Sequence, residues 1–178
     1  MEFLFLDTET TGLQGPRLIE LAYSVGDDVG VFQAFFKPPI EIHPMATKAH
    51  GLTIDMLEHC PSFQEVPDKA KLQALLETHI LVAHNLRYDK SVLENEGLKV
   101  HQGICTVQLA KQLYPLHLNH QLQTLKQHFK IEVMGSAHSG IGDVRVLKKM
   151  FHLMRAEHEE KAGIIMWEDL IRRSIQYF

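Results

Sequence analysis

Two acidic side chains follow directly on the first strand-like segment of the chain. Residues 1–6 have the pattern of a short buried strand, and the sequence Asp-Thr-Glu-Thr-Thr-Gly follows at positions 7–12. Because strand side chains alternate between two faces, Asp7 and Glu9 project the same way. Two like charges about 4 Å apart near a protein surface repel by roughly 4 kcal/mol. The pair therefore indicates either a cation site suited to Mg²⁺ or Mn²⁺, or an ordinary polar turn at a strand end.

Composition restricts the class of protein. The 178 residues are 45% hydrophobic and 22% charged, which is typical of one globular domain. The formal charge of -4 predicts that any nucleic-acid contact uses a local patch or metal ions. Cys60 and Cys105 offer no disulfide framework and no Cys-x-x-Cys metal pair. Without a long apolar run or a leader-like start, we expect a cytoplasmic protein with no membrane contact.

The chain pattern predicts strands first and then strands that alternate with helices. Expected strands cover residues 3–6, 18–25, 29–36, 80–83 and 104–107. Expected helical segments cover residues 45–50, 54–59, 63–77, 88–95, 107–113, 121–129, 143–156 and 166–178. In the last of these, Trp167, Leu170 and Ile171 are expected to dock on the body. This order predicts an α/β domain with a mixed sheet covered by helices.

Two further acidic positions follow in the middle and late parts of the chain. Asp89 lies in His-Asn-Leu-Arg-Tyr-Asp, directly after the apolar segment 80–83, and Asp143 ends His-Ser-Gly-Ile-Gly-Asp. Each has an ordinary structural explanation: an aspartate at position 89, in the first turn of a helix, is stabilised by the helix dipole, and Asp143 caps a helix. His138, at the start of the late motif, is likewise explained as a loop histidine. The order of the three acidic motifs is more specific than any one of them.

Taken together, the three motifs resemble those of the DEDDh 3′→5′ exonucleases, the family that includes the proofreading epsilon subunit of bacterial DNA polymerase III. The similarity runs over roughly residues 1–155. The stretch Asp-Thr-Glu-Thr-x-Gly-Leu-Gln-Gly, with Ile-Cys-Thr at positions 104–106 and Leu-Ala at positions 109–110, looks closest to exonuclease X. Two positions depart from the family, since Gly140 and Val144 stand where alanine is common.

The resemblance implies an RNase H-like fold, a five-stranded mixed sheet flanked by helices. It also implies two divalent metal ions, Mg²⁺ or Mn²⁺, bound by Asp7, Glu9, Asp89 and Asp143, which act with His138 as the general base. An unperturbed imidazole pKa near 6.5 suits this role. We expect a single exonuclease domain over residues 1–178, with the motifs within 1–155 and a helical extension over 156–178.

The family also indicates which residues contact the substrate. Leu13 lies where an apolar side chain packs against the terminal bases, and Gln14 is a candidate for strand separation, although both are also ordinary turn residues. The full predicted set of substrate-binding residues is Thr10, Leu13, Gln14, Met45, His50 and Asn85.

Three functions remain open at this point. The leading one is a metal-dependent 3′→5′ exodeoxyribonuclease that releases 5′-mononucleotides from single-stranded or frayed DNA 3′ ends. The second is an RNA-trimming 3′→5′ exoribonuclease, although that branch usually has Asp-Met-Glu-Met-Thr-Gly in the first motif. The third is a non-catalytic nucleic-acid-binding module associated with a DNA polymerase. A zinc protein is disfavoured, because the twelve histidines show no zinc-ligand spacing.

Overall fold

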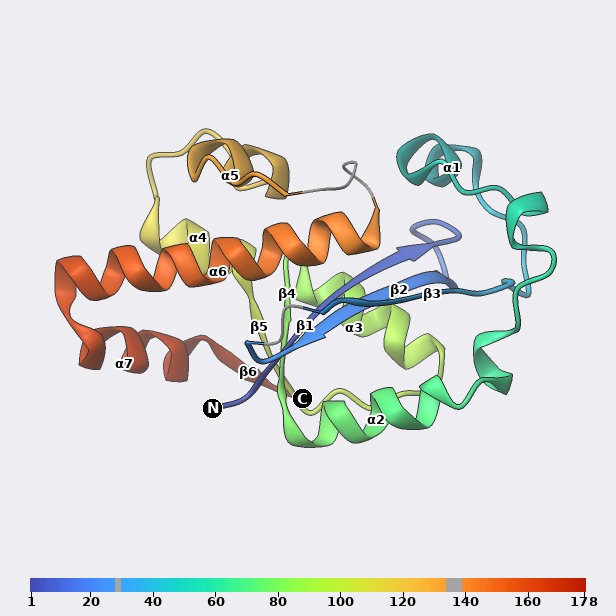
Figure 1. Ribbon diagram of the computed structural model, residues 1–178, viewed down its shortest axis with the longest axis horizontal. Helices are drawn as coiled ribbons and strands as arrows, with labels where there is room; N and C mark the ends of the chain where they lie inside the picture. Colours follow the sequence, from blue (N-terminus) through green and yellow to red (C-terminus); the bar gives the residue numbers. More distant parts are fainter. Residues whose placement is uncertain (28–29, 134–138) are drawn as a thin grey trace.

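The computed structural model describes residues 1–27, 30–133 and 139–178 and has three layers (Figure 1). A mixed sheet in the order β3-β2-β1-β4-β5-β6 forms the middle layer. Its strands are β1 (Phe3–Thr10), β2 (Leu18–Val25), β3 (Phe32–Phe35), β4 (Ile80–Ala83), β5 (Gln102–Cys105) and β6 (Ile175–Tyr177). The helices are α1 (Pro44–His50), α2 (Asp68–Thr78), α3 (Leu86–Asn95), α4 (Thr106–Leu113), α5 (Leu122–His128), α6 (Gly140–Ala162) and α7 (Ile164–Ser174).

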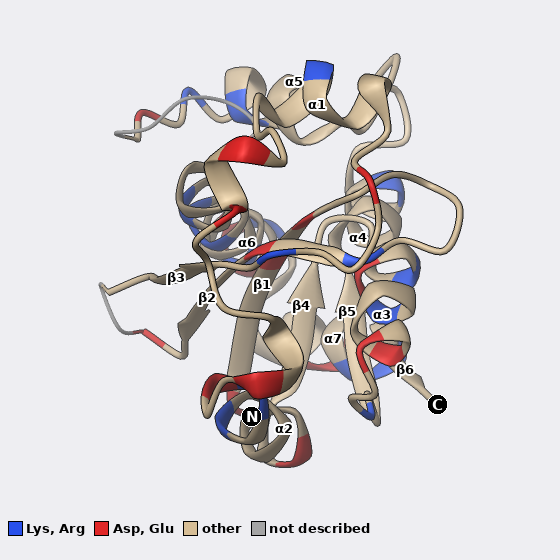
Figure 2. Cartoon of the chain, turned by 90° about the vertical axis from the view of Figure 1, so that its right-hand side faces the viewer, with Lys and Arg blue, Asp and Glu red and all other residues tan. Residues whose placement is uncertain are grey.

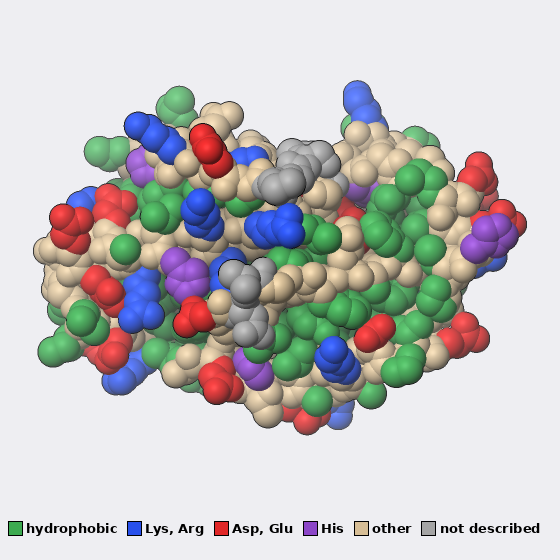
Figure 3. Space-filling view, in the orientation of Figure 1, with side chains coloured by type: hydrophobic (Ala, Val, Ile, Leu, Met, Phe, Trp, Pro, Cys, Tyr) green, Lys and Arg blue, Asp and Glu red, His purple; other side chains and the backbone are tan. Residues whose placement is uncertain are grey.

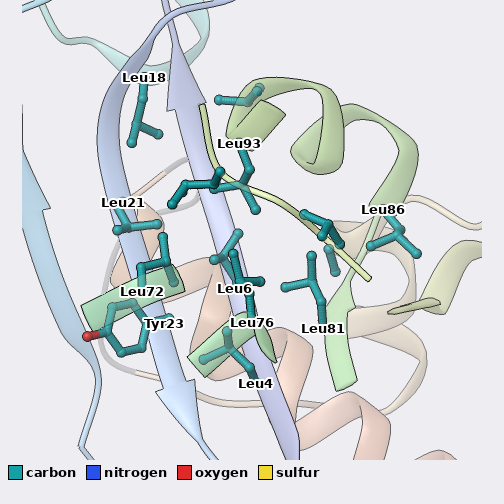
Figure 4. Close-up of a cluster of buried hydrophobic side chains, with 14 of the residues drawn as sticks. Leu4, Leu6, Leu18, Leu21, Tyr23, Leu72, Leu76, Leu81, Leu86 and Leu93 are labelled. Carbon is teal, nitrogen blue, oxygen red and sulfur yellow. The ribbon is translucent and has the colours of Figure 1, made fainter. Parts of the chain in front are cut away.

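Strand β1 holds the layers together because its side chains alternate between the two faces. Leu4 and Leu6 are fully buried on the face covered by α2 and α3, where Figure 4 shows them among other leucines. Phe5 is fully buried on the other face and packs edge-on against Phe151 of α6, with ring centroids 5.5 Å apart. Each such side chain contributes about 1.5–3 kcal/mol of burial free energy. The alternation continues beyond Leu6, so it also sets the directions of the polar side chains that follow.

The carboxyl end of β1 lies close to several other segments of the chain. β1 runs antiparallel to β2 and parallel to β4, and the β1–β2 register shifts between Glu9 and Thr10. Register irregularities of this kind often re-aim side chains near functional sites. Because β1 and β4 are parallel, the segment that follows β4 starts at the edge where β1 ends. In Figure 1, β1 also points towards α1 and the start of α6.

The structure confirms the mixed sheet flanked by helices, with one correction to the strand count. Over its described residues the sheet has six strands, not five. The predicted helix over 166–178, and with it the all-helical extension over 156–178, is replaced near its end by β6, which pairs antiparallel with β5. A three-residue strand is too short to show an alternating pattern. Trp167 and Ile171 are buried on α7, as expected.

Helix α6 begins earlier than its sequence pattern predicts. It starts at Gly140 and includes Gly142, although glycine lowers helix propensity. The side chain of Ser139 caps this start by accepting a hydrogen bond from the Gly142 amide at 3.3 Å. Among the described residues, no helix is long and apolar enough to cross a membrane.

Candidate active site

Three carboxylates from two distant segments meet at the carboxyl end of β1. Asp7 and Glu9 come from β1 and Asp143 from the first turn of α6, and one ligand oxygen of each lies within 4.8 Å of the others. Figure 2 shows acidic positions where β1 lies beside α6. The alternation of β1 explains why Asp7 and Glu9 share a side, as predicted from the sequence. Asp143 joins this pair because α6 packs beside the end of β1.

Asp89 approaches the same end of β1 from the opposite face of the sheet. Thr8 lies between Asp7 and Glu9, so its side chain points towards α3, and its hydroxyl donates a hydrogen bond to Asp89 Oδ1 at 2.9 Å. Asp89 is only 5% exposed. Asp89 thus stands beside the three clustered carboxylates, oriented by a residue of the first acidic motif.

Asp143 also has an orienting partner. Gln123 of α5 donates a hydrogen bond from its side-chain amide to Asp143 Oδ1 at 3.1 Å. Sequence reasoning missed both Thr8 and Gln123 in this role, because their partners lie far away along the chain. Each carboxylate bound in this way has a restricted rotamer, which favours a preorganised ligand set.

The carboxylates are electrostatically unfavourable without a cation. Burial, reinforced by the charge of Asp89, raises the pKa of Asp7 well above its ordinary value. Burial also raises the pKa of Glu9 to about 8, with Glu20 as the largest charge contribution. The pKa of Asp89 rises to about 7 because of burial, although the hydrogen bond from Thr8 opposes the rise. Closely spaced hard oxygen donors of this kind fit a divalent cation such as Mg²⁺ or Mn²⁺.

The metal-free protein is expected to lose stability as the pH rises from about 4.5 to about 8. Glu9 has an ordinary pKa of 4.5 and a folded-state pKa of about 8, so its stabilising contribution is complete below 4.5 and is lost towards 8. Thermal unfolding in EDTA should show a midpoint that falls by several degrees over this range, since each kcal/mol moves it by about 2–4 °C. Added Mg²⁺ or Mn²⁺ should restore the midpoint most strongly at high pH.

Glu9→Gln provides the comparison, because it keeps the shape of the side chain and removes the titrating group. Its midpoint in EDTA should vary less with pH than that of the wild type. Glu77→Gln, which changes an exposed carboxylate on α2, should follow the wild type. Equal pH dependence in the wild type and Glu9→Gln would contradict the expectation.

A fifth carboxylate, Glu20 of β2, lies near the cluster and was not predicted. It is 2% exposed, pairs opposite Glu9 across the β1–β2 ladder, and accepts a hydrogen bond from the Gly140 amide at 2.9 Å. A signal for it does exist in the sequence. Glu20 is the one charged residue in the apolar run Leu-Ile-Glu-Leu-Ala-Tyr, and charged residues are rarely fully buried without a specific partner.

Thr10 and His50 meet at the turn that follows β1. The Tyr88 hydroxyl donates to the Gly12 carbonyl oxygen at 2.9 Å and lies 2.5 Å from Thr10 Oγ1. His50 Nε2 lies 3.3 Å from the Thr10 carbonyl oxygen. Gly12 has φ of 150°, and a Cβ there would lie 3.1 Å from His43 Cβ, so α1 approaches this turn closely. Tyr88, like Thr8, Gln123 and Glu20, was not assigned a role from the sequence.

The other predicted substrate residues lie on the surface or partly so. Leu13 and Met45 are 86% and 64% exposed, and Gln14 is exposed beside Leu13. Asn85 precedes α3 and lines a groove of about 600 Å³ with Arg87, Lys90 and Phe178. The predicted role of His138 concerns a position outside the described residues.

His84, which precedes Asn85, is a partly buried residue with structural hydrogen-bond partners. Burial lowers its pKa to about 4, so its ring is neutral near pH 7. Its Nε2 donates to the His120 carbonyl oxygen at 2.9 Å, and its Nδ1 lies 3.0 Å from Thr106 Oγ1. His84 therefore ties the end of β4 to the loop before α5, the helix that carries Gln123.

Basic side chains gather over α6, where Figure 3 shows Lys and Arg on one face. Arg145, Lys148 and Lys149 line a hollow of about 490 Å³ there. Lys148 donates to Ser24 Oγ at 3.2 Å and lies over the Phe5 ring, so it has a structural contact within the fold.

A mixed sheet with Asp7, Glu9 and Asp143 clustered at the end of β1 fits the class of nucleases that use divalent metal ions. The chain belongs to the exonuclease family, because a family model with that description matches residues 4–151. The resemblance to DEDDh 3′→5′ exonucleases, which are phosphodiester hydrolases, is thereby confirmed. Members of this family use divalent metal ions, which agrees with the carboxylate cluster.

Several known proteins are similar to this chain. DNA polymerase III PolC-type of Halalkalibacterium halodurans is 31% identical over 99% of the chain, which covers 12% of that polymerase. RNA exonuclease 4 of Debaryomyces hansenii is 30% identical over 89% of the chain and 60% of its own length. The solved structure of exonuclease X in complex with 5′-overhanging duplex DNA has a TM-score of 0.71 at 24% identity, over 90% of this chain and 93% of that one. The last similarity supports the fold.

Proposed function

We propose that this chain is a metal-dependent 3′→5′ exodeoxyribonuclease that releases 5′-mononucleotides from single-stranded or frayed DNA 3′ ends. The observation that carries the proposal is the meeting of Asp7, Glu9 and Asp143 within 4.8 Å, with Asp89 bound to Thr8 beside them. Two divalent ions would be held by these four carboxylates. When bound, such ions stabilise the attacking water and the leaving 3′ oxygen of an in-line displacement.

The protein's own residues have three tasks in this proposal. Thr8 and Gln123 orient the carboxylates of Asp89 and Asp143. His138 accepts the proton of the attacking water, a role that typically contributes 10² to 10⁴-fold. The turn after β1 receives the terminal nucleotide, with the Thr10 backbone near the 3′ end.

The exposed apolar side chains near this turn support the assignment of a nucleic-acid end. Leu13 and Met45 present large apolar surfaces to solvent, which suits packing against bases that have left a duplex. Gln14 is adjacent to Leu13 and would help to separate the strands. His50 and Asn85 complete the proposed substrate contacts, His50 through the Thr10 carbonyl and Asn85 through the groove beside α3.

The similar proteins favour DNA and also provide a competing substrate. The exonuclease X structure is a complex with DNA, and the PolC-type relatives are DNA polymerases, which makes a polymerase a candidate partner. RNA exonuclease 4 has similar identity to this chain, so RNA is the second candidate substrate. Threonine at positions 8 and 10, in place of the methionines usual in the oligoribonuclease branch, favours DNA.

Matched DNA and RNA oligonucleotides, labelled at either end, test the proposal. With Mg²⁺ or Mn²⁺ we expect 5′-labelled DNA to shorten one nucleotide at a time, 3′-labelled DNA to release labelled 5′-mononucleotide at once, and EDTA to stop both reactions. RNA should be degraded at least about tenfold more slowly, a difference of roughly 1.4 kcal/mol in transition-state binding. Faster degradation of RNA would establish the exoribonuclease, and no degradation of any end would establish a binding module.

A further inference from the structure

Glu20 occupies a costly position for a carboxylate. It is 2% exposed on the central part of the sheet and lies directly opposite Glu9. Burial raises its pKa, and the charge of Asp143 acts in the same direction. A buried carboxylate beside other carboxylates destabilises the metal-free protein unless specific donors compensate. The contacts of Glu20 therefore indicate what the residue does.

Two nitrogen donors hold the Glu20 carboxylate in one place. Its Oε1 accepts a hydrogen bond from the Gly140 main-chain amide at 2.9 Å and from the Gln33 side-chain amide at 2.6 Å. Gly140 is the first residue of α6, so its amide is one of the helix-start donors that lack a partner within the helix. A carboxylate is also favoured there by the helix dipole.

The contact is close enough to set the position of the helix. A Cβ on Gly140 would lie 2.7 Å from Glu20 Oε1 and 2.8 Å from Ala22 Cβ, so only glycine allows the helix start to lie this near β2. Asp143 lies one turn further along α6 and reaches the oxygens of Asp7 and Glu9 from there. The position of Asp143 thus depends on where Gly140 is held.

We propose that Glu20 is a positioning residue of the metal site: it binds the Gly140 amide and thereby holds the start of α6 where Asp143 completes the ligand set with Asp7 and Glu9. The inference rests on the proposed function for the assignment of these three carboxylates as metal ligands. In this role, the length of the Glu20 side chain matters, because it brings an acceptor oxygen to Gly140, and its negative charge does not.

Two substitutions of Glu20 distinguish the effect of side-chain length from the effect of charge. Glu20→Gln keeps the length of the side chain and an acceptor oxygen for Gly140 but removes the charge. Glu20→Asp keeps the charge but is one methylene shorter, so its oxygen withdraws from Gly140. We expect Glu20→Asp to weaken Mn²⁺ binding by about 10 to 100-fold, as substitutions of residues that orient metal ligands do, and Glu20→Gln to stay within about threefold of the wild type.

Isothermal titration of Mn²⁺ into the substrate-free protein measures this effect without reference to activity. Amide hydrogen exchange provides a second measurement, in which Gly140 should exchange faster in Glu20→Asp than in Glu20→Gln. Glu96→Ala is the matched control, because Glu96 is also buried, at 3% exposed, and accepts hydrogen bonds from Arg17 and the Leu18 amide. It should lower the unfolding midpoint without weakening Mn²⁺ binding.

The outcomes distinguish this inference from the proposed function. If the wild type binds no Mn²⁺ in the millimolar range, the assignment of the metal ligands is wrong. If the wild type binds Mn²⁺ and Glu20→Asp binds it equally well, the positioning role is wrong. Weak binding by Glu20→Gln beside normal binding by Glu20→Asp would also overturn it, because charge would then be the relevant property. If Glu96→Ala weakened Mn²⁺ binding as much as Glu20→Asp, general destabilisation would explain the effect and the positioning role would be wrong.

Discussion

Asp7→Asn is expected to abolish exonuclease activity and to stabilise the metal-free protein at neutral pH. Removal of one preorganised electrostatic group typically costs 10² to 10³-fold in rate, and Asp7 is one of the residues that would hold the metal ions, so we expect a loss of more than about 10³-fold. The stability effect has the opposite sign. Burial and the neighbouring carboxylates raise the pKa of Asp7, so its charged form is unfavourable in the folded state.

Initial rates on a 3′-labelled DNA oligonucleotide and thermal unfolding in EDTA measure the two effects on the same preparations. Asp55→Asn is the control, since Asp55 is exposed in a short 3₁₀ turn and is not among the charges that raise the pKa of Asp7. It should leave both rate and midpoint unchanged. If Asp7→Asn retained more than a tenth of the wild-type rate, the assignment of Asp7 to the proposed site would be wrong. A lower midpoint in EDTA would contradict the electrostatic account.

His138→Ala is expected to lower kcat by about 10² to 10⁴-fold while Mn²⁺ binding stays within a few-fold of the wild type. A general base acts in its unprotonated form, so the wild-type rate should rise with pH through the imidazole pKa, ordinarily near 6.5. In His138→Ala this limb of the profile should disappear. The prediction rests on the sequence motif, because residue 138 lies outside the described residues.

Two measurements separate a base from a ligand or a structural residue. Titration of Mn²⁺ into His138→Ala tests whether the histidine contributes to metal affinity, and the pH profile of kcat tests proton transfer. His59→Ala, which changes an exposed histidine after the first 3₁₀ turn, serves as the matched control. If His138→Ala kept the wild-type pH profile, another residue would be the general base. If it lost much of its Mn²⁺ affinity, His138 would instead be a metal ligand.

The motifs, the family and most of the fold were predictable from the sequence because their signals are local. Alternation along a strand needs only adjacent residues, and it correctly placed Asp7 and Glu9 on one side. The apolar segment before Asp89 correctly indicated a strand over residues 80–83, and the structure shows that it pairs in parallel with β1. The strand β6 was missed, because its pairing with β5 exists only once α7 has turned the chain back.

The exposed residues near the site could not be identified from sequence patterns. The predicted substrate contacts came from the resemblance, and no periodicity marks them. Their exposure, such as 86% for Leu13, is a property of the folded surface. The role of Tyr88 of α3 was not predicted, because its partners, Thr10 at the end of β1 and Gly12 in the following turn, lie more than 70 positions away along the chain.

The sequence by itself determined the order of the acidic motifs, the sheet with its helices, and the shared direction of Asp7 and Glu9, since each depends on neighbouring residues. Only the tertiary structure decided how these parts meet. Thr8 binds Asp89 across 81 positions of sequence, and Glu20 binds Gly140 across 120. Such contacts depend on strand pairing and helix packing, so no local pattern contains them. Long-range packing converted a pair of repelling carboxylates on β1 into a larger, oriented cluster that fits divalent metal ions.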